Sequence, residues 1–196
     1  EMFEGKKVKV TDLEIEGLKL IDLKAYHDSR GYFVERFNFE TFKKLGLPTE
    51  FKQDNHSRSK PKVIRGLHFQ HSEPQGKLVG VIRGKIWDVA VDLRQNSKTF
   101  GKYASVELSE ENQHVLWIPA GFAHGFCVLG DSEADVLYKV DVTYNAKGEL
   151  GIKWNDPKLN IGWPVKDPIV SDKDQVLASF ADYKGSALCQ QTWWKK

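Results

Sequence analysis

The chain has 196 residues, a formal net charge of +2 and hydrophobic residues at 40% of its positions. This length is typical of one domain with a hydrophobic core, so we expect residues 1–196 to form a single domain. Positive and negative charges are mixed along the chain without a basic stripe, which argues against nucleic-acid binding. No apolar run approaches the roughly 20 residues of a membrane span, and the first residues lack the apolar core of a signal peptide.

The cysteine content is low. Cys127 and Cys189 are the only two cysteines, and a single pair in a chain of this size does not indicate a disulfide framework. With no membrane span and no signal peptide in the pattern, we expect a soluble, cytoplasmic protein.

The first third of the chain reads as short strands and turns. Residues 13–23 alternate loosely around Gly17, which predicts an early pair of strands. Residues 28–31, Asp-Ser-Arg-Gly, are typical of a turn, and residues 32–37 are expected to leave it as a strand.

One short helix is predicted next. Asn38 is a suitable N-cap, since its side-chain oxygen can accept from a free backbone N–H of the first turn. Phe39, Phe42 and Leu45 follow near helical spacing, and Gly46 can end the helix.

Two longer strands are predicted at residues 77–82 and 85–93, joined as a hairpin around Arg83-Gly84. In the second of them, alternate residues share a face, and both faces carry bulky side chains. One face is therefore expected to meet a core, and the other a barrel lumen or a partner subunit.

Residues 103–108 and 134–142 read as further strands. Regular alternation is lost after Trp163-Pro164, in the stretch that ends with the tail, residues 176–196. Many short strands separated by Gly and Pro turns, with little helix, predict an all-β jelly roll or barrel with a few short helices.

Two segments carry a family resemblance. Residues 63–70, Val-Ile-Arg-Gly-Leu-His-Phe-Gln, and residues 117–126, Trp-Ile-Pro-Ala-Gly-Phe-Ala-His-Gly-Phe, resemble the paired signature motifs of the cupin superfamily, small β-barrels that bind a ligand inside. A metal-binding cupin has His-x-His in the first motif and a Glu a few residues later. Here Gln70 replaces the second His, and no Glu follows at that spacing, so these motifs cannot supply a full His₃Glu metal shell. His68 is then free to act as a general base.

A longer series of segments resembles the dTDP-4-dehydrorhamnose 3,5-epimerase family over roughly residues 20–175. An ordered series of this kind is far more specific than a single motif. The segments that carry the resemblance are, in chain order, residues 28–33, 53–57, 65–70, 75–79, 87–94, 117–126, 137–139, 154–157 and 171–174.

The resemblance implies the epimerisation of dTDP-4-dehydro-6-deoxy-D-glucose at carbons 3 and 5. The product would be dTDP-4-dehydro-L-rhamnose, in dTDP-L-rhamnose biosynthesis for cell-surface polysaccharide. The ketone at carbon 4 acidifies the hydrogens on carbons 3 and 5. Inversion then requires a base on one ring face, an acid on the other, and a cationic or hydrogen-bonding group near the enolate oxygen. The resemblance implies no metal and no other cofactor.

The resemblance also assigns catalytic roles. His68 is the general base, and Asp174 orients it and stabilises its protonated form. Tyr138 is the proton donor from the opposite ring face, and Lys77 stabilises the enolate. Asp88, which shares a strand face with Asp92, is a looser candidate for a second partner in the pocket. Each of these residues also has a purely structural alternative. His68 could be a hydrogen-bonded histidine inside the barrel, the tyrosines could pack as ordinary aromatic side chains, and the charged residues could face solvent.

Substrate binding is implied for a larger group of residues. Tyr144 is the expected stacking platform for the thymine ring, although the sequence leaves open whether the two tyrosines exchange roles. The family resemblance implies a homodimer in which Arg30 and Glu35 reach into the neighbouring site. The remaining expected binding residues are Gln53, Asp54, Asn55, Arg65, His124, Glu149 and Lys173.

Three alternatives stay open at the level of sequence. The protein could invert one carbon only, or act on another nucleotide-linked 4-keto sugar. It could be a metal-dependent cupin enzyme, or a sugar-binding cupin without catalysis. The sequence assigns no role to Trp193 and Trp194 of the tail.

Overall fold

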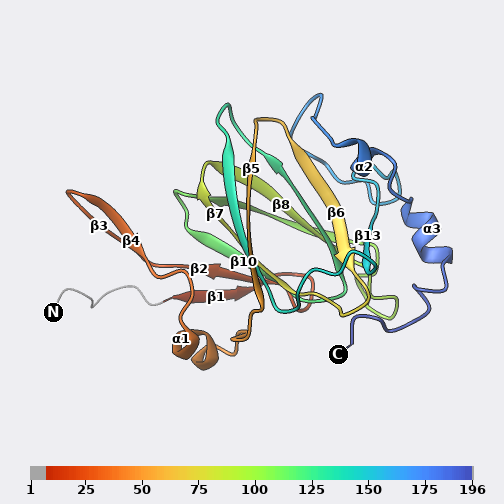
Figure 1. Cartoon of the computed structure of the whole chain (residues 1–196), viewed down its shortest axis with the longest axis horizontal. Helices are drawn as coiled ribbons and strands as arrows, with labels where there is room; N and C mark the ends of the chain where they lie inside the picture. Colours follow the sequence, from red (N-terminus) through yellow and green to blue (C-terminus); the bar gives the residue numbers. More distant parts are fainter. Residues whose placement is uncertain (1–7, 196) are drawn as a thin grey trace.

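The computed structural model describes residues 8–195, which form thirteen strands and three short helices. Most strands belong to two antiparallel sheets (Figure 1). The six-stranded sheet has the order β1 (Lys9–Asp12), β2 (Lys19–Asp22), β10 (His114–Ile118), β7 (Lys77–Arg83), β12 (Ala134–Val140) and β5 (Gln53–Ser59). The five-stranded sheet has the order β13 (Glu149–Gly151), β6 (Ile64–Gln70), β11 (Phe122–Val128), β8 (Lys85–Asp92) and β9 (Tyr103–Ser109).

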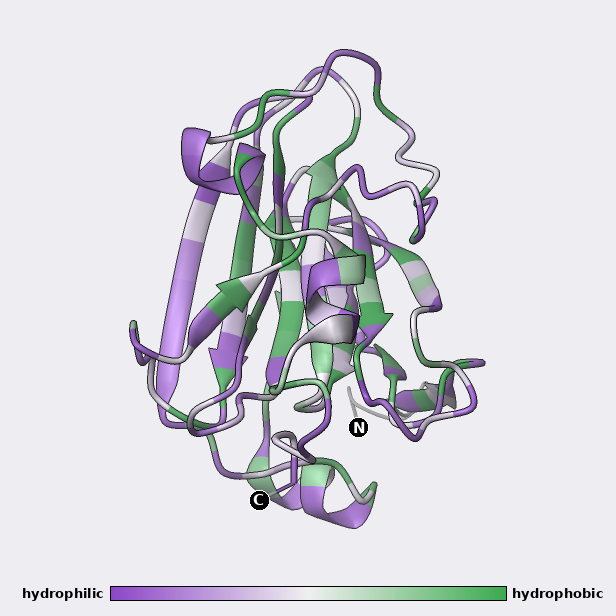
Figure 2. Cartoon of the chain, turned by 90° about the vertical axis from the view of Figure 1, so that its right-hand side faces the viewer, coloured by the Kyte–Doolittle hydropathy of each residue, from purple (hydrophilic) through white to green (hydrophobic). Residues whose placement is uncertain are grey.

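The main core lies between these two sheets. Buried Val79 and Val81 of the six-stranded sheet belong to the same apolar cluster as Ile86 and Ala90 of the five-stranded sheet. Apolar segments concentrate in the central strands, whereas many connecting loops are hydrophilic (Figure 2). The prediction of an all-β, cupin-type fold is confirmed, but the sheets of the described residues are not closed into a barrel.

The predicted hairpin around Arg83-Gly84 is wrong. β7 pairs with β10 and β12, whereas β8 pairs with β11 and β9, so the turn carries the chain from one sheet to the other. Gly84 has a φ of 76°, a conformation that favours glycine in any tight turn. A turn between two sheets and a hairpin turn therefore have the same local signature. Because of this crossover, β7 belongs to the six-stranded sheet and β8 to the five-stranded sheet.

Other boundaries differ by a few residues. The early strand pair is present, in register from Lys9↔Asp22 to Asp12↔Lys19, but only β2 lies within the predicted residues 13–23, whereas β1 ends before them. The expected strand after the Asp-Ser-Arg-Gly turn is shorter than predicted: β3 (Ala25–Asp28) pairs with β4 (Gly31–Val34), and β4 ends before Glu35. β12 likewise ends at Val140 and not at residue 142.

The predicted helix is confirmed as α1 (Phe39–Lys44). The Asn38 side chain caps it and accepts from the Thr41 backbone N–H at 3.0 Å. Two further helices, α2 (Asp172–Gln175) and α3 (Phe180–Gly185), lie in the part of the chain where no regular pattern is visible.

The chain's own tail packs on the five-stranded sheet, on the face turned away from the main core (Figure 1). Trp193 stacks at 5.1 Å from Phe69 of β6, measured between ring centroids. The indole of Trp193 donates to the Tyr183 hydroxyl at 3.0 Å, which donates to the backbone carbonyl of Leu93 at 2.8 Å. The second face of β8 was expected to meet a barrel lumen or a partner subunit. It is covered instead by the tail of the same chain.

The β3–β4 hairpin projects away from the sheets (Figure 1). It exposes 47% of Tyr32 and 64% of Phe33. Within residues 8–195, no helix has the length and apolar character needed to cross a membrane.

Candidate active site

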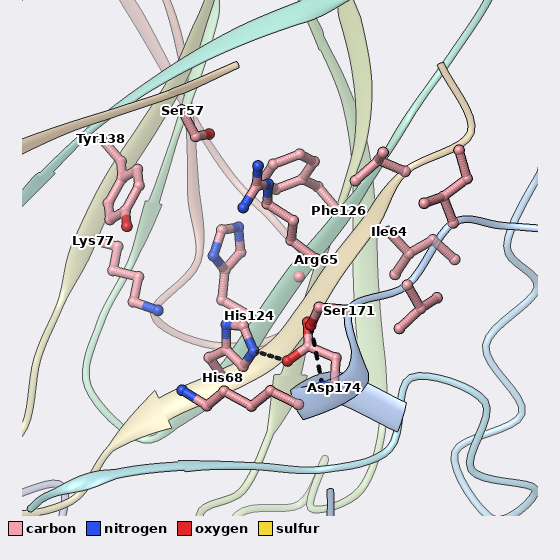
Figure 3. Close-up of a pocket in the computed structure, with 15 residues that line it drawn as sticks. Ser57, Ile64, Arg65, His68, Lys77, His124, Phe126, Tyr138, Ser171 and Asp174 are labelled. Atoms are coloured by element: carbon pink, nitrogen blue, oxygen red, sulfur yellow. Dashed lines mark hydrogen bonds and ion pairs between the residues drawn. The ribbon is translucent and has the colours of Figure 1, made fainter. Parts of the chain in front are cut away.

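A cavity of about 530 Å³ opens between the two sheets (Figure 3). It brings together seven of the residues singled out in the sequence, contributed by strands of both sheets and by the segment around α2: Arg65, His68, Lys77, His124, Tyr138, Lys173 and Asp174.

His68 and Asp174 form a close pair in this cavity. β6 carries His68, and its Nε2 lies 2.6 Å from Asp174 Oδ1 (Figure 3). The other carboxylate oxygen accepts from the Gly66 backbone N–H at 3.0 Å. Burial alone would raise the pKa of Asp174, but these two hydrogen bonds outweigh it and hold the pKa below its usual value. Asp174 is thus an ionised carboxylate that fixes the orientation of the imidazole.

Two glycines allow β6 and β11 to approach closely beside this pair. Gly66 has a φ of 127°, and a Cβ built there would lie 2.6 Å from the Gly125 Cα and 2.8 Å from the His124 carbonyl oxygen. A larger residue would push the strands apart. The close approach keeps His68 and His124 directly opposite each other in the strand register.

His124 has a carboxylate of its own. Its Nε2 lies 2.7 Å from Asp88 Oδ1 on the neighbouring strand β8. Asp88 is fully buried and does not line the cavity, so it lies behind His124 and is not a second partner of His68. Its Oδ2 has no hydrogen-bond partner among residues 8–195.

Lys77 and Tyr138 enter the cavity from the six-stranded sheet. Tyr138 pairs with Val79, two residues from Lys77, so the two side chains lie on the same face of neighbouring strands. Burial lowers the pKa of Lys77 to about 8, against the opposite effect of Asp88 and Glu149. Burial also raises the pKa of Tyr138, so its phenol keeps its proton at neutral pH.

A second polar cluster lies beside the cavity. Glu149 Oε2 accepts from the Lys173 ammonium at 2.7 Å and from the Tyr144 hydroxyl at 2.9 Å. Burial would raise the pKa of Glu149, but these two partners lower it further than burial raises it. Tyr144 is 54% exposed. Because β12 ends at Val140, strand alternation does not determine the direction of Tyr144.

The three polar residues at the start of β5 divide between two faces. Asn55 lies opposite Tyr138 and therefore shares its face, and Gln53 donates to it at 2.9 Å. Asp54 faces away from Tyr138 and pairs with Lys139 at 2.8 Å.

Arg30 and Glu35 are not brought to the cavity of their own chain. Arg30 belongs to the projecting hairpin, where its guanidinium lies 2.6 Å from the Asp28 carboxylate. Glu35 follows directly after β4.

Several lining residues were not singled out in the sequence. Ser57 and Phe126 lie within segments that carry the family resemblance, so those motifs could have indicated them. Ile169 and Val170 also line the cavity, next to a parallel bridge that pairs Ile169 with Val63. No local sequence pattern indicates this bridge. Among residues 8–195, no group of three or more His, Cys, Asp or Glu side chains is arranged to hold a metal ion.

Comparison with known proteins points to one family. A model of the dTDP-4-dehydrorhamnose 3,5-epimerase family matches residues 12–182. A dTDP-4-dehydrorhamnose 3,5-epimerase of Shigella flexneri is 49% identical over 178 residues, which cover 89% of this chain and 97% of that protein.

Solved structures agree with this match. The dTDP-6-deoxy-D-glucose-3,5-epimerase of Legionella pneumophila, in complex with dTDP-4-keto-L-rhamnose, is similar with a TM-score of 0.84 at 43% identity, covering 88% of this chain and 93% of that one. A double mutant of a 3'-monoepimerase of Streptomyces bikiniensis, in complex with dTDP, is similar with a TM-score of 0.83 at 29% identity, and the match covers 88% of each chain. The chain belongs to the dTDP-4-dehydrorhamnose 3,5-epimerase family, and its activity is that of an epimerase.

Proposed function

We propose that the protein epimerises dTDP-4-dehydro-6-deoxy-D-glucose at carbons 3 and 5 and forms dTDP-4-dehydro-L-rhamnose, in dTDP-L-rhamnose biosynthesis. The names of its relatives support this reaction. The observation that carries the proposal is the shared cavity: His68 with its carboxylate enters it from one sheet, and Tyr138 enters it from the other.

In the proposed mechanism, His68 is the base. Its Nε2 is directed at Asp174, so the neutral imidazole has its lone pair on Nδ1, and this nitrogen takes the proton from carbon 3 or carbon 5. The electron pair of the broken C–H bond moves into the enolate, whose negative charge lies on the oxygen at carbon 4. Asp174 stabilises the resulting imidazolium, as a base-orienting carboxylate does in hydrolases.

Tyr138 completes each inversion. Its phenol gives a proton to the same carbon from the opposite ring face, and the enolate returns to the ketone. Lys77 and His124 hold the enolate oxygen, because a cationic donor in a partly dry cavity stabilises developing negative charge strongly. Before the second cycle, His68 releases its proton to solvent and Tyr138 takes one from solvent. Repeating the cycle at the second carbon then gives the L-rhamno product without any net change in oxidation state.

The nucleotide is proposed to bind at the cavity mouth. Arg65 and Lys173 line the cavity and suit the diphosphate oxygens. Tyr144 would stack on the thymine ring, since much of its side chain is exposed. The remaining proposed binding residues are Gln53, Asp54, Asn55 and Glu149.

We also propose that the protein is a homodimer. The projecting hairpin exposes Tyr32 and Phe33, which form an apolar surface that a second copy can cover. In that arrangement Arg30 and Glu35 would reach the partner's cavity. The single domain of residues 1–196 and a cytoplasmic location stay predictions.

A second candidate function is inversion at one carbon only. It is favoured by the similarity to the Streptomyces bikiniensis 3'-monoepimerase, because an epimerase with that name has nearly the same backbone. The two functions differ in the product formed from the same substrate.

The test is proton NMR of dTDP-4-dehydro-6-deoxy-D-glucose incubated with the protein in deuterium oxide. The proposal predicts deuterium at carbons 3 and 5 and signals of the L-rhamno product. Deuterium and inversion at one carbon alone would establish the second candidate. An unchanged substrate would contradict both.

A further inference from the structure

Gln70, the last residue of β6, binds the backbone on both sides of Tyr144. The Tyr144 loop, residues 141–148, connects β12 to β13 and lies outside both strands. The Gln70 carboxamide nitrogen donates to the Thr143 carbonyl at 3.2 Å, and its oxygen accepts from the Asn145 backbone N–H at 2.8 Å. One side chain thus holds the residue before Tyr144 and the residue after it.

Two further glutamines hold the same loop. The carboxamide oxygen of Gln53, at the start of β5, accepts from the Tyr144 backbone N–H at 2.9 Å. The carboxamide nitrogen of Gln75, shortly before β7, donates to the Val142 carbonyl at 2.8 Å. Four consecutive loop residues therefore each have a backbone group bound by a glutamine side chain. The Tyr144 hydroxyl is fixed separately, by donating to Glu149 at 2.9 Å.

Gln70 connects this loop to the strand of the proposed base. Its side chain is buried, with 3% exposure, and its nitrogen also donates to the Glu73 carbonyl at 2.8 Å. Strand residues two apart share a face, so Gln70 leaves β6 on the same face as His68. The position of Tyr144 is therefore tied to that of His68 through one strand and one carboxamide.

We propose that Gln70 is a positioning residue for the nucleotide: with Gln53 and Gln75 it holds the Tyr144 ring at a fixed separation from His68, so that one dTDP-sugar reaches both. This inference rests on the proposed function, in which Tyr144 stacks on the thymine ring. Gln70 acts on the ligand only through the loop. A loop that is ordered before binding spares the ligand the cost of ordering it, and this gain appears as affinity.

The test measures the Kd of dTDP by calorimetry, which needs no turnover. Gln70→Met keeps the length of the side chain but removes its hydrogen bonds to the loop. We expect dTDP to bind about tenfold more weakly to this variant and to Tyr144→Ala, as is usual when a base loses its aromatic stacking partner. In the double variant, Gln70→Met should add little to the effect of Tyr144→Ala, because it acts through that ring.

Steady-state kinetics give an independent readout. Gln70→Met leaves the His68–Asp174 pair in place, and the affinity that it removes is the same in the ground state and the transition state. KM for the dTDP sugar should therefore rise by about tenfold, while kcat stays unchanged. A fall in kcat at an unchanged KM would overturn the inference.

Gln113→Met is the matched control. Gln113 is also buried, with 4% exposure, and its carboxamide donates to a backbone carbonyl, that of Glu110, at 2.6 Å. Its replacement should destabilise the protein in urea while the Kd of dTDP stays unchanged. The same result for Gln70→Met would show a merely structural role and overturn the inference. So would a loss of affinity that persists in full in the Tyr144→Ala background.

A milder variant covers the case in which Gln70→Met does not fold. Gln75→Met removes only the hydrogen bond to Val142 and should raise the Kd of dTDP by about threefold. An unchanged Kd in the folded glutamine variant, with a raised Kd in Tyr144→Ala, would overturn the inference and leave the proposed function intact. An unchanged Kd in Tyr144→Ala would also overturn the inference. The predicted losses of dTDP affinity in a protein that does not convert the dTDP sugar would overturn the proposed function alone.

Discussion

His68 and His124 lie directly opposite each other on the adjacent antiparallel strands β6 and β11. Each has its Nε2 on a separate carboxylate, at 2.6 Å for Asp174 and 2.7 Å for Asp88. Their surroundings differ, because the Asp174 carboxylate is fully hydrogen-bonded and the Asp88 carboxylate is not. Two histidines therefore line one cavity, and each is held by its own carboxylate in a different hydrogen-bonding environment.

Tyr138→Phe should separate proton removal from inversion. The base remains, so deuterium from solvent should still enter the substrate, whereas the proton from the opposite face is lost. We expect the rate of product formation to fall by about 10²–10⁴-fold, the usual contribution of a general acid. The readout is NMR of exchange and product in the same sample. Tyr103→Phe is the control, because Tyr103 lies on β9 outside the cavity; an equal loss in both variants would contradict the assignment.

Gly66→Ala should destabilise the fold through a steric clash. The new methyl group would meet the backbone of Gly125, which cannot rotate away. We expect a loss of about 1–3 kcal/mol in the free energy of unfolding from overpacking, added to the strain of a positive φ. Gly130→Ala provides the comparison, since Gly130 also has a positive φ but no atom within 4 Å of a built Cβ. Urea unfolding measures both, and equal losses would exclude a clash at Gly66.

The stability of the His68–Asp174 pair should depend on pH. The folded-state pKa of Asp174 is below its usual value of 3.8, so the carboxylate stabilises the fold above that value. This stabilisation is lost as pH falls through the lowered folded-state pKa. The free energy of unfolding of the wild-type protein should therefore exceed that of Asp174→Asn at neutral pH. Urea titrations should show the difference shrinking below pH 4, and a difference that is constant with pH would contradict this view.

Tyr183→Phe should loosen the tail. The substitution keeps the ring but removes a hydroxyl that links Trp193 to the Leu93 carbonyl. Leaving buried polar partners unpaired costs about 1–3 kcal/mol. The free energy of unfolding should fall by this amount, together with faster proteolysis near the C-terminus. Tyr32→Phe, on the projecting hairpin, serves as the exposed control, since 47% of Tyr32 is exposed; a smaller loss for Tyr183→Phe than for this control would contradict the tail's role.

The strand pattern and the motifs predicted much of the site. The segment around His68 and the segment around His124 were identified separately, and the structure places these residues side by side. The α1 cap was also predictable, because an N-cap depends on residues close in sequence. Local patterns of this kind reflect backbone preferences within one element.

Long-range pairing explains what was missed. The turn at Gly84 looks like a hairpin from its sequence, yet it joins two sheets because each strand finds better partners elsewhere. The role of Trp193 depends on Phe69, far away in the chain, and the bridge between Val63 and Ile169 likewise has no local signal. The contact between Asp88 and His124 follows from strand order, which alternation alone does not determine.

The most direct test of the central claim compares the wild-type protein with His68→Ala. Each is incubated with dTDP-4-dehydro-6-deoxy-D-glucose in deuterium oxide, and hydrogen exchange at carbons 3 and 5 is followed by proton NMR. Exchange at both carbons in the wild-type protein, and none above background in folded His68→Ala, is the predicted result. Exchange that persists in His68→Ala at a comparable rate would contradict the assignment of His68 as the base.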